Sequence, residues 1–497
     1  MDVIAPGGAR RVAASADACA GPPEFERIDP ALGTVASRAA ACRARDAVAA
    51  VNAAARAFPA WAGTQPQERR RILMRAAALV EAEAAEIGRT MRAEIGATDL
   101  WVRFNIDVAR LHLEEAAAMV TSITGSVSHA PDGMSFAFRE PVGVCLAMAP
   151  WNAPFVLGMR AIATALACGN AVVLKASEIC PATHLLIGAI FTQAGLPADV
   201  LNIVTHAPEH AAEVVEALIG HDAVRRVNFT GSTRVGRIVA GVAARHLKRC
   251  LLELGGKAPL VVLDDADLDA AADAAAFGAF LNQGQICMST DRIIVLDRVA
   301  DAFTDKLVER AARLKAGDPR TGEWPLGPVV NAAGARRLAD LVRDAVGKGA
   351  QLRAGGPAGN TFMDATVIDH LAPGMSLYAE ESFGPVAGIC RAASEDEAIG
   401  IANDTSYGLS AAVFSRDVGR ALAVARRIES GICHINAPTV SDRPDVPFGG
   451  VRDSGYGRFG GQAALDEFTE LRWVSVGQGP RAYPFLHGHQ QPLGRTS

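Results

Sequence analysis

Cysteine pairs, metal-ligand spacings and membrane-length apolar runs are all missing from this chain of 497 residues. Its nine cysteines form an odd set without a C-x-x-C pair, which argues against a disulfide framework or a zinc knuckle and favours reduced thiols in a cytoplasm. The eleven histidines show no metal-binding spacing, so no metal site is expected. No stretch has the length and apolarity of a membrane span. Residues 1–23 lack the continuous apolar region of a signal peptide and are interpreted as a flexible lead-in.

An excess of charge of either sign is missing as well. The formal net charge is −5 and the pI is near 6.2, so the chain has no basic character suited to nucleic acid or an anionic membrane, and neither is expected as a partner. Half of the residues are hydrophobic and 21% are charged, which is typical of a soluble globular protein. The length exceeds what one hydrophobic core organises, so two or more domains are expected.

Helical periodicity dominates residues 46–123, where apolar side chains recur at intervals of three and four, and Pro66-Gln67-Glu68 has the composition of a helix start. The polar, glycine-bearing stretch 124–140 contains an alternating segment, 134–138, typical of a hairpin strand. Residues 471–476 also have strand character but few neighbours. We expect them to pair with a hairpin elsewhere, either in the same chain or in a second subunit.

Short apolar strands alternate with longer helices in the middle of the chain. The expected strands are 142–149, 171–174, 200–204 and 226–229, and the expected helices are 154–166, 181–194, 211–219 and 235–244. The alternation restarts after Gly255-Gly256, with strands at 259–263 and 292–296 and a helix at 268–280. This pattern predicts an α/β protein with two doubly wound parallel-sheet domains, the second beginning near Glu253. Nucleotides bind at the carboxyl ends of such strands.

Cys287 differs from the other cysteines in its surroundings. It lies in the polar, glycine-containing stretch 282–290, whereas Cys145 and Cys168 lie in apolar segments. This setting favours a reactive thiolate, with a buried structural thiol as the alternative. A serine nucleophile is disfavoured because the chain has no G-x-S-x-G motif.

Glu253 stands among leucines, directly before Leu254 and the two glycines. Partial desolvation there would raise the pKa of its carboxyl group toward neutrality, as a general base requires, whereas an exposed or salt-bridged glutamate is the ordinary alternative.

The segment 229–236 closes a strand and opens a helix, so its N–H groups could face a pyrophosphate. Its G-x-x-x-x-G spacing is neither G-x-G-x-x-G nor a P-loop, and a plain helix-capping turn is the alternative.

Together with Pro150-Trp151-Asn152, these motifs resemble the NAD(P)-dependent aldehyde dehydrogenases over about residues 28–476. The resemblance implies that Cys287 attacks an aldehyde to give a thiohemiacetal, that hydride leaves for a nicotinamide, and that Glu253 activates the water that hydrolyses the thioester. The Asn152 amide and the Cys287 backbone N–H would stabilise the oxyanion. Two features depart from the family. Phe459 replaces an acid, which removes support for a proton relay through a second glutamate, and 205–207 lack the usual glycines, so phosphate contacts there are not carried over.

The resemblance also implies an NAD site. Lys175 would contact the adenosine ribose, and the anionic Glu178 beside the 2′ position would favour NAD over NADP. Glu381 and Phe383 match the family's clamp on the nicotinamide ribose. The expected cofactor-binding residues are Pro150, Trp151, Lys175, Ser177, Glu178, Phe229, Thr230, Gly231, Ser232, Leu254, Glu381 and Phe383.

The resemblance implies three parts. They are an NAD-binding domain with a variant Rossmann fold (1–123, 141–252 and 447–470), a catalytic domain (253–446) and a small β segment for oligomerisation (124–140 and 471–497). A homodimer or homotetramer is expected.

Within the family the motifs look most like those of bacterial salicylaldehyde and vanillin dehydrogenases, which implies an aromatic aldehyde. Arg160 could meet a phenolate or ring hydroxyl. Candidate pocket residues, each of which could equally be core, are Trp101, Met159, Arg160, Ile286, Met288 and Phe448.

Three other functions stay open. The substrate could be an aliphatic aldehyde or semialdehyde. Glu253 disfavours a CoA-acylating enzyme, because such an enzyme needs no base to activate water. A catalytically silent nucleotide-binding scaffold is disfavoured by the intact Cys287, Glu253 and Asn152.

Overall fold

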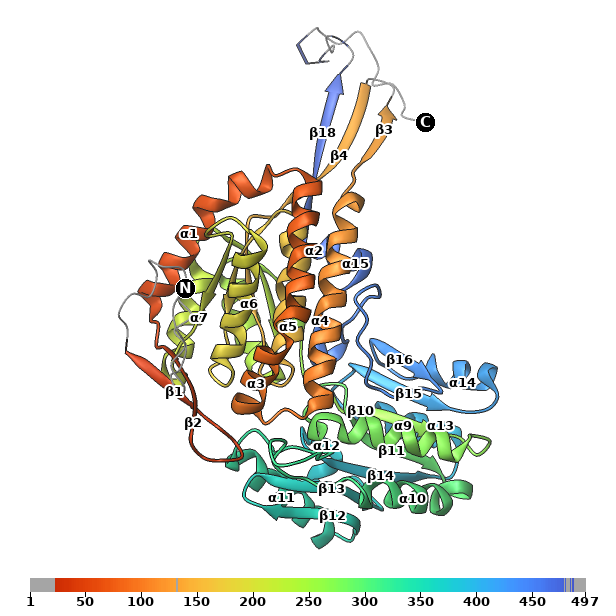
Figure 1. The fold of residues 1–497 in the computed structure, drawn as a ribbon. Helices are drawn as coiled ribbons and strands as arrows, with labels where there is room; N and C mark the ends of the chain where they lie inside the picture. The colour runs from red at the N-terminus through yellow and green to blue at the C-terminus, as the bar shows by residue number, and fades with distance from the viewer. Residues whose placement is uncertain (1–22, 131–132, 478, 480–482, 484, 487–497) are drawn as a thin grey trace.

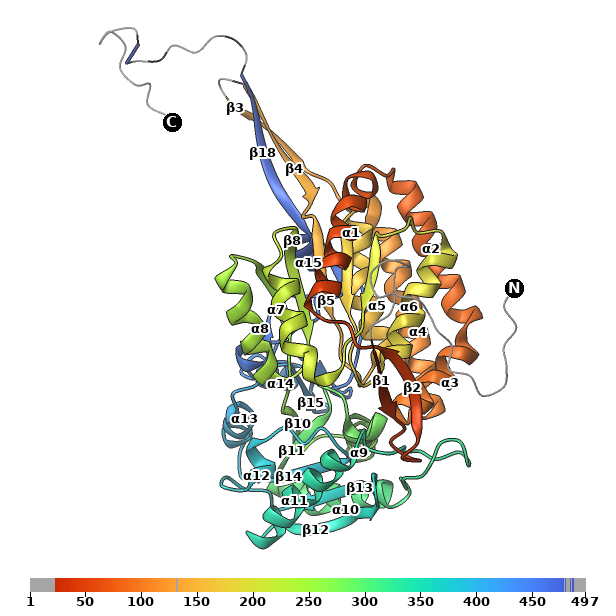
Figure 2. The ribbon, with the colours of Figure 1, turned by 90° about the vertical axis from the view of Figure 1, so that its left-hand side faces the viewer.

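The computed structural model describes residues 23–130, 133–477, 479, 483 and 485–486, so most of the expected lead-in and most of 478–497 lie outside the described residues. Figures 1 and 2 show two α/β bodies, one above the other, and a narrow sheet that projects from the upper body. A small antiparallel pair, β1 (Glu24–Ile28) and β2 (Val35–Ala40), precedes the first long helix.

The upper body contains a six-stranded sheet in the order β17-β9-β8-β5-β6-β7, parallel except for the edge strand β17. The strands are β5 (Val144–Met148), β6 (Ala171–Lys175), β7 (Leu201–Val204), β8 (Val224–Thr230), β9 (Arg249–Glu253) and β17 (Gly455–Tyr456). Every residue of β5 is buried, as expected for a parallel strand covered on both faces.

Helices cover both faces of this sheet. Apolar residues on one face pack with α1 (Ala44–Ala62), α7 (Ala211–Gly220) and α8 (Thr233–Arg245). Those on the other face pack with α2 (Pro66–Ala82), α3 (Ala84–Ile95), α4 (Asp99–Met119), α5 (Pro154–Ala167), α6 (Pro181–Ala194) and α15 (Gly461–Phe468). The chain runs from β5 outward to β6 and β7, then returns to β8 and β9 on the other side of β5. The carboxyl ends of β5 and β8 therefore form a topological switch point, where doubly wound sheets bind ligands.

The lower body contains a seven-stranded sheet in the order β12-β13-β14-β11-β10-β15-β16, parallel except for the pair β12 and β13. The strands are β10 (Ala258–Val262), β11 (Thr290–Leu296), β12 (Gln351–Gly359), β13 (Phe362–Asp369), β14 (Val386–Ala392), β15 (Ser410–Phe414) and β16 (Ile432–Ile435). On one face pack α9 (Leu268–Phe280) and α10 (Asp297–Ala312). On the other pack α11 (Ala332–Gly347), α12 (Ser376–Ala379), α13 (Glu395–Asn403) and α14 (Val418–Ala425).

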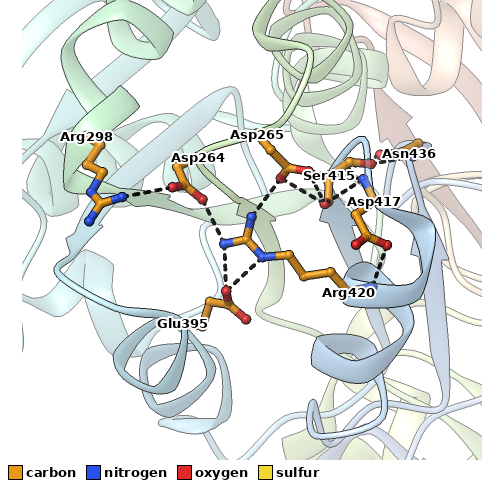
Figure 3. Close-up of polar contacts among 8 residues, drawn as sticks. All are labelled: Asp264, Asp265, Arg298, Glu395, Ser415, Asp417, Arg420 and Asn436. Carbon is orange, nitrogen blue, oxygen red and sulfur yellow. Dashed lines mark hydrogen bonds and ion pairs between the residues drawn. The ribbon is translucent and has the colours of Figure 1, made fainter.

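The switch point of this second sheet lies between β10 and β15, and ion pairs fill it (Figure 3). Arg420 Nη2 lies 2.7 Å from Asp264 Oδ1, Nη1 lies 3.1 Å from Asp265 Oδ1, and Nε lies 2.8 Å from Glu395 Oε1. Because these charges satisfy one another, this edge offers little to a ligand. The residues of interest gather instead at the opposite, amino edge, where Cys287 precedes β11.

The projecting sheet joins β3 (Ser126–Ala130), β4 (Gly133–Pro141) and β18 (Thr469–Gly477). β18 pairs with β4 along its whole length, from Thr469 opposite Pro141 to Gly477 opposite Gly133. The expected pairing with a hairpin is confirmed, but the hairpin belongs to the same chain. The large apolar side chains Leu471 and Trp473 are exposed on this sheet.

The helices and strands expected between residues 142 and 296 are all present, with ends that differ by at most two residues. The helical region divides into four α-helices, and α2 begins at Pro66 as expected. The short strand β9, which ends at Glu253, was not anticipated, because five residues before two glycines give little periodicity. The division into domains is consistent with the two sheets but stays a prediction.

The cysteines depart from expectation at one position. Cys42 is disulfide-bonded, so the interpretation of uniformly reduced thiols is wrong there. The free thiols among the described residues are Cys145, Cys168, Cys180, Cys250, Cys287, Cys390 and Cys433. Within the described ranges, no helix is long and apolar enough to cross a membrane, and no group of His, Cys, Asp or Glu could hold a metal ion.

Candidate active site

A cavity of about 210 Å³ lies where the switch point of the six-stranded sheet meets the amino edge of the seven-stranded sheet. It contains all three residues expected to be catalytic and eight of the twelve expected to bind cofactor, together with Gly255, which sequence reasoning missed. The lining residues are Pro150, Trp151, Asn152, Thr230, Gly231, Ser232, Glu253, Leu254, Gly255, Cys287, Glu381 and Phe383.

The backbone before Cys287 adopts an unusual conformation. Asn282, Gln283 and Gly284 have φ values of 49°, 55° and 66°, three consecutive residues in the left-handed region. Side-chain bonds hold the two non-glycine residues, since Asn282 Nδ2 donates to Asn152 O at 3.1 Å and Gln283 Nε2 donates to Pro328 O at 3.2 Å. A side chain at Gly284 would lie 2.1 Å from Gly384 O, so only glycine fits. Such strained segments persist where the surroundings over-determine them, often at active sites.

The Cys287 thiol is half-buried and packs against the largest apolar cluster of the upper body. Burial raises the pKa of this thiol well above its ordinary value, and the neighbouring Glu253 carboxylate raises it further. The thiol therefore holds its proton at neutral pH until a base accepts it. Of the two carboxyl groups that line the same cavity, Glu253 and Glu381, the one that acts more strongly on the thiol is the candidate base.

Glu253 is that candidate base, at the carboxyl end of β9 and fully buried. Its Oε2 accepts a hydrogen bond of 2.9 Å from Arg160 Nη2, while Oε1 has no hydrogen-bond partner among the described residues. Burial raises the pKa of this carboxyl, although the Arg160 charge opposes that effect. A raised pKa and one free oxygen suit a group that accepts and returns protons near neutrality.

Asn152 follows β5 and is held from both ends. Its side-chain Nδ2 donates to Gln285 O at 2.9 Å, two residues before Cys287, and its backbone oxygen accepts from Trp101 Nε1 at 2.8 Å. The amide is therefore fixed close to the cysteine loop, where an oxyanion on the attacked carbonyl would form.

Replacing Asn152 with alanine is expected to lower kcat for aldehyde oxidation by about 10²- to 10³-fold, the loss typical of removing one oxyanion donor. Affinity for NAD should be retained. Steady-state kinetics checks both values, and Asn228→Ala is a matched control, since Asn228 is also buried but donates to Ala161 O outside the cavity. A kcat for Asn152→Ala within threefold of the parent would contradict the role.

The opposite wall of the cavity carries groups suited to a nucleotide. Ser232 caps α8, and its Oγ accepts a hydrogen bond of 3.4 Å from Val235 N. Because Ser232 lines the cavity, the N-terminus of α8 lies next to it. Glu381 accepts a bond of 3.0 Å from Gly256 N, and burial raises the pKa of its carboxyl to about 7. The rings of Trp151 and Phe383 meet edge to face with centroids 5.5 Å apart.

Four expected cofactor residues lie outside the cavity. Lys175 ends the neighbouring strand β6, and Ser177 and Glu178 follow it, with Lys175 Nζ 3.9 Å from Glu178 Oε2. Burial lowers the pKa of Lys175, and Glu178 partly offsets this effect. The ring of Phe229 packs against the turn before α8, since a Cβ added at Gly231 would lie 2.5 Å from that ring.

The six residues expected to form the substrate pocket are all buried, and none of them lines the cavity that Cys287 and Glu253 share. Five belong to the apolar cluster against which Cys287 packs, namely Trp101, Met159, Ile286, Met288 and Phe448. Arg160 instead directs its guanidinium at Glu253. Contact of these residues with a substrate stays a prediction.

Sequence reasoning missed several neighbours of the site. Gln285 belongs to the polar stretch before Cys287, but its contact with Asn152 could not be predicted, and Asp442 and His112 carry no local signal because each contacts a residue far away in the chain. Asp442 lies 3.6 Å from Arg160 Nη1 and 3.5 Å from His112 Nε2, and all three side chains are buried. Only the packing of α4 and α5 with the loop after β16 reveals this group.

A doubly wound sheet whose switch point opens on a half-buried cysteine and a buried glutamate is typical of an enzyme that combines a thiol nucleophile with a nucleotide-binding fold. The family model described as the aldehyde dehydrogenase family matches residues 18–474, and the chain belongs to this family.

Individual relatives are similar over nearly the whole chain. A vanillin dehydrogenase of Pseudomonas fluorescens is 54% identical over 462 residues, covering 93% of this chain and 96% of the relative. A benzaldehyde dehydrogenase [NAD(+)] of Pseudomonas putida is 39% identical, covering 92% and 94%. The crystal structure of a salicylaldehyde dehydrogenase from Pseudomonas putida G7 complexed with salicylaldehyde matches with a TM-score of 0.92 and 47% identity, covering 93% and 96%.

Proposed function

We propose that this aldehyde dehydrogenase oxidises aromatic aldehydes to carboxylates with NAD, through a covalent intermediate on Cys287. The observation that carries the chemistry is that the buried Glu253 carboxyl interacts with the Cys287 thiol in one cavity, while its Oε1 has no hydrogen-bond partner by geometry among the described residues. Family membership supports the reaction class. The vanillin, benzaldehyde and salicylaldehyde dehydrogenases among its relatives support the aromatic substrate.

Cys287 and Asn152 each have one catalytic task, whereas Glu253 acts as a base twice. Glu253 accepts the Cys287 proton, and the thiolate attacks the aldehyde carbon to form a thiohemiacetal. The Asn152 amide stabilises the oxyanion formed in that attack. A nicotinamide bound in the cavity would supply the acceptor for the hydride that the thiohemiacetal loses when it becomes a thioester on Cys287. Glu253 passes this proton to solvent and then takes a proton from water, whose hydroxide attacks the thioester. The Cys287 thiolate leaves and recovers the proton of the new carboxyl group, and the carboxylate is released.

The residues present fit a dinucleotide. The first turn of α8 offers N–H groups to a diphosphate, because helix N-termini attract anions. Lys175 and Glu178 would hold the adenosine ribose, and Glu381 would accept from the other ribose. The carboxylate of Glu178 disfavours a 2′-phosphate, which supports NAD over NADP.

We also propose a homodimer or homotetramer that uses the sheet of β3, β4 and β18, because exposed Leu471 and Trp473 there would gain by burial. The division into a cofactor domain (1–123, 141–252 and 447–470), a catalytic domain (253–446) and an oligomerisation segment (124–140 and 471–497) is part of this proposal, as is a cytoplasmic location. The alternatives are oxidation of an aliphatic aldehyde or semialdehyde and a silent nucleotide-binding scaffold.

A substrate panel tests the proposed function. Vanillin, salicylaldehyde and benzaldehyde should have kcat/KM values about 10- to 200-fold above those of aliphatic aldehydes and semialdehydes, the range that apolar pocket differences supply. NAD should be preferred over NADP. Absorbance at 340 nm measures each rate. A higher kcat/KM for a semialdehyde would overturn the aromatic assignment, and no turnover with any aldehyde would favour the scaffold.

A further inference from the structure

Four buried ionisable side chains form a line that leads away from the cavity. Arg160 Nη2 lies 2.9 Å from Glu253 Oε2, Arg160 Nη1 lies 3.6 Å from Asp442 Oδ2, and His112 Nε2 lies 3.5 Å from Asp442 Oδ1. None of the four side chains is more than 7% exposed. They come from α5, β9, the loop after β16 and α4, so only the complete fold assembles them.

Aromatic rings fix the guanidinium at the centre of this line. Arg160 Cζ lies 4.6 Å from the ring centroid of Phe448 and 4.6 Å from that of Phe459. Such cation–π contacts strengthen when they are desolvated. Phe448 and Phe459 thus hold the guanidinium between two rings. The guanidinium therefore points one nitrogen at each of two carboxylates.

We propose that Arg160, anchored by Asp442 and His112, is a positioning residue that holds Glu253 through Oε2 and leaves Oε1 free for the proton of the attacking water. This inference rests on the proposed function and deepens it. A buried carboxylate without a cation loses its proton reluctantly and has no fixed orientation. Arg160 supplies both the charge and the orientation, while Asp442 and His112 keep Arg160 in place.

A competing role for Arg160 is direct contact with a hydroxyl on the substrate ring. Its Nε has no hydrogen-bond partner among the described residues and could serve that purpose. The two roles differ in which aldehydes they affect. Positioning acts through Glu253 and slows hydrolysis of every thioester, whereas a substrate contact matters only for hydroxylated rings.

The first experiment measures NADH formation by Arg160→Met in stopped flow with benzaldehyde and with salicylaldehyde. We expect a burst near one NADH per active site followed by hydrolysis slowed by about 10²-fold, the contribution of a general base that is no longer held. The slowing should be equal for both aldehydes. Arg160→Lys, which retains a cation, should recover part of the hydrolysis rate.

The pH profile of hydrolysis provides a readout that simple structural damage would not give. The groups that face Glu253 are Arg160 from α5, Cys287 from the loop before β11 and Asp442 from the loop after β16, with His112 and Glu381 beyond them. Removing the positive charge in Arg160→Met should raise the pKa of Glu253, so hydrolysis should need a higher pH. Removing a negative charge in Asp442→Asn should lower it, and the midpoint should move to lower pH.

Arg226→Met is the matched control, because Arg226 is equally buried and ion-paired but contacts Glu467 and Glu470 outside the site. It should keep the parent ratio of burst to hydrolysis. An unchanged ratio in Arg160→Met, or slowing confined to salicylaldehyde, would overturn the proposal. If Arg160→Met does not fold, the pH profiles of Asp442→Asn and Arg160→Lys serve instead. Hydrolysis midpoints in both variants identical to that of the parent would overturn the proposal. Failure of the proposed function would appear separately, as a parent enzyme that oxidises neither aldehyde.

Discussion

Replacing Cys287 with alanine is expected to abolish aldehyde oxidation, lowering kcat by roughly 10⁴-fold or more, as the removal of a covalent nucleophile does in other enzymes. Asn152 and Glu253 cannot compensate, because neither can form the thioester from which the carboxylate is released. Binding of NAD should persist, since the change removes one sulfur atom from the cavity and no group expected to contact the nucleotide. NADH formation at 340 nm and calorimetric titration with NAD measure the two effects.

Cys433→Ala is the control for this experiment, because Cys433 is also a half-buried free thiol but lies in β16, away from the cavity. It should retain the parent rate. Turnover retained by Cys287→Ala would remove the cysteine from the mechanism, and the proposed function would fail with it.

Glu253→Gln is expected to slow thioester hydrolysis by about 10²- to 10⁴-fold, the range of general-base contributions, while hydride transfer is affected less. The amide keeps the shape of the side chain but cannot accept a proton from water. A burst of NADH should therefore persist, slower than in the parent because Cys287 also loses its base, and be followed by very slow turnover. Stopped-flow absorbance at 340 nm resolves the two phases.

The pH dependence of the parent enzyme follows from the same residue. Burial raises the pKa of Glu253, and the group acts as a base only when it is ionised, so hydrolysis should be lost as the pH falls through that raised pKa. The burst amplitude of Glu253→Gln decides between two tasks. If the burst disappears along with turnover, Glu253 serves chiefly to deprotonate Cys287, whose raised pKa requires a base.

Local patterns in the sequence were sufficient for the helices and strands expected between residues 142 and 296, whereas those between 297 and 468 were not predicted. The alternation between residues 142 and 296 predicted two parallel sheets because strands and helices bury apolar side chains with different periods. Cys287 and Glu253 also carried local signals, a polar niche for one and leucines before glycine for the other. Strand β9 escaped prediction because its five residues are too few to show a period.

Arg160 shows where such reasoning stopped. The sequence suggested a cation near the substrate, and the structure directs that cation to Glu253 and Asp442. Residues 160, 253 and 442 lie on segments separated by many helices and strands, so no window of sequence contains their contact. The order of the strands brings them together.

The amino-acid sequence by itself determined the two α/β sheets, the reactive setting of Cys287 and the apolar setting of Glu253, because each depends on neighbours along the chain. Only the tertiary structure decided that the switch point of one sheet opens on Cys287 while that of the other is filled by Arg420 and its carboxylates. It also decided that Arg160 lies between two aromatic rings and holds one oxygen of Glu253. These contacts depend on strand order and on desolvation, which arise only when distant segments pack.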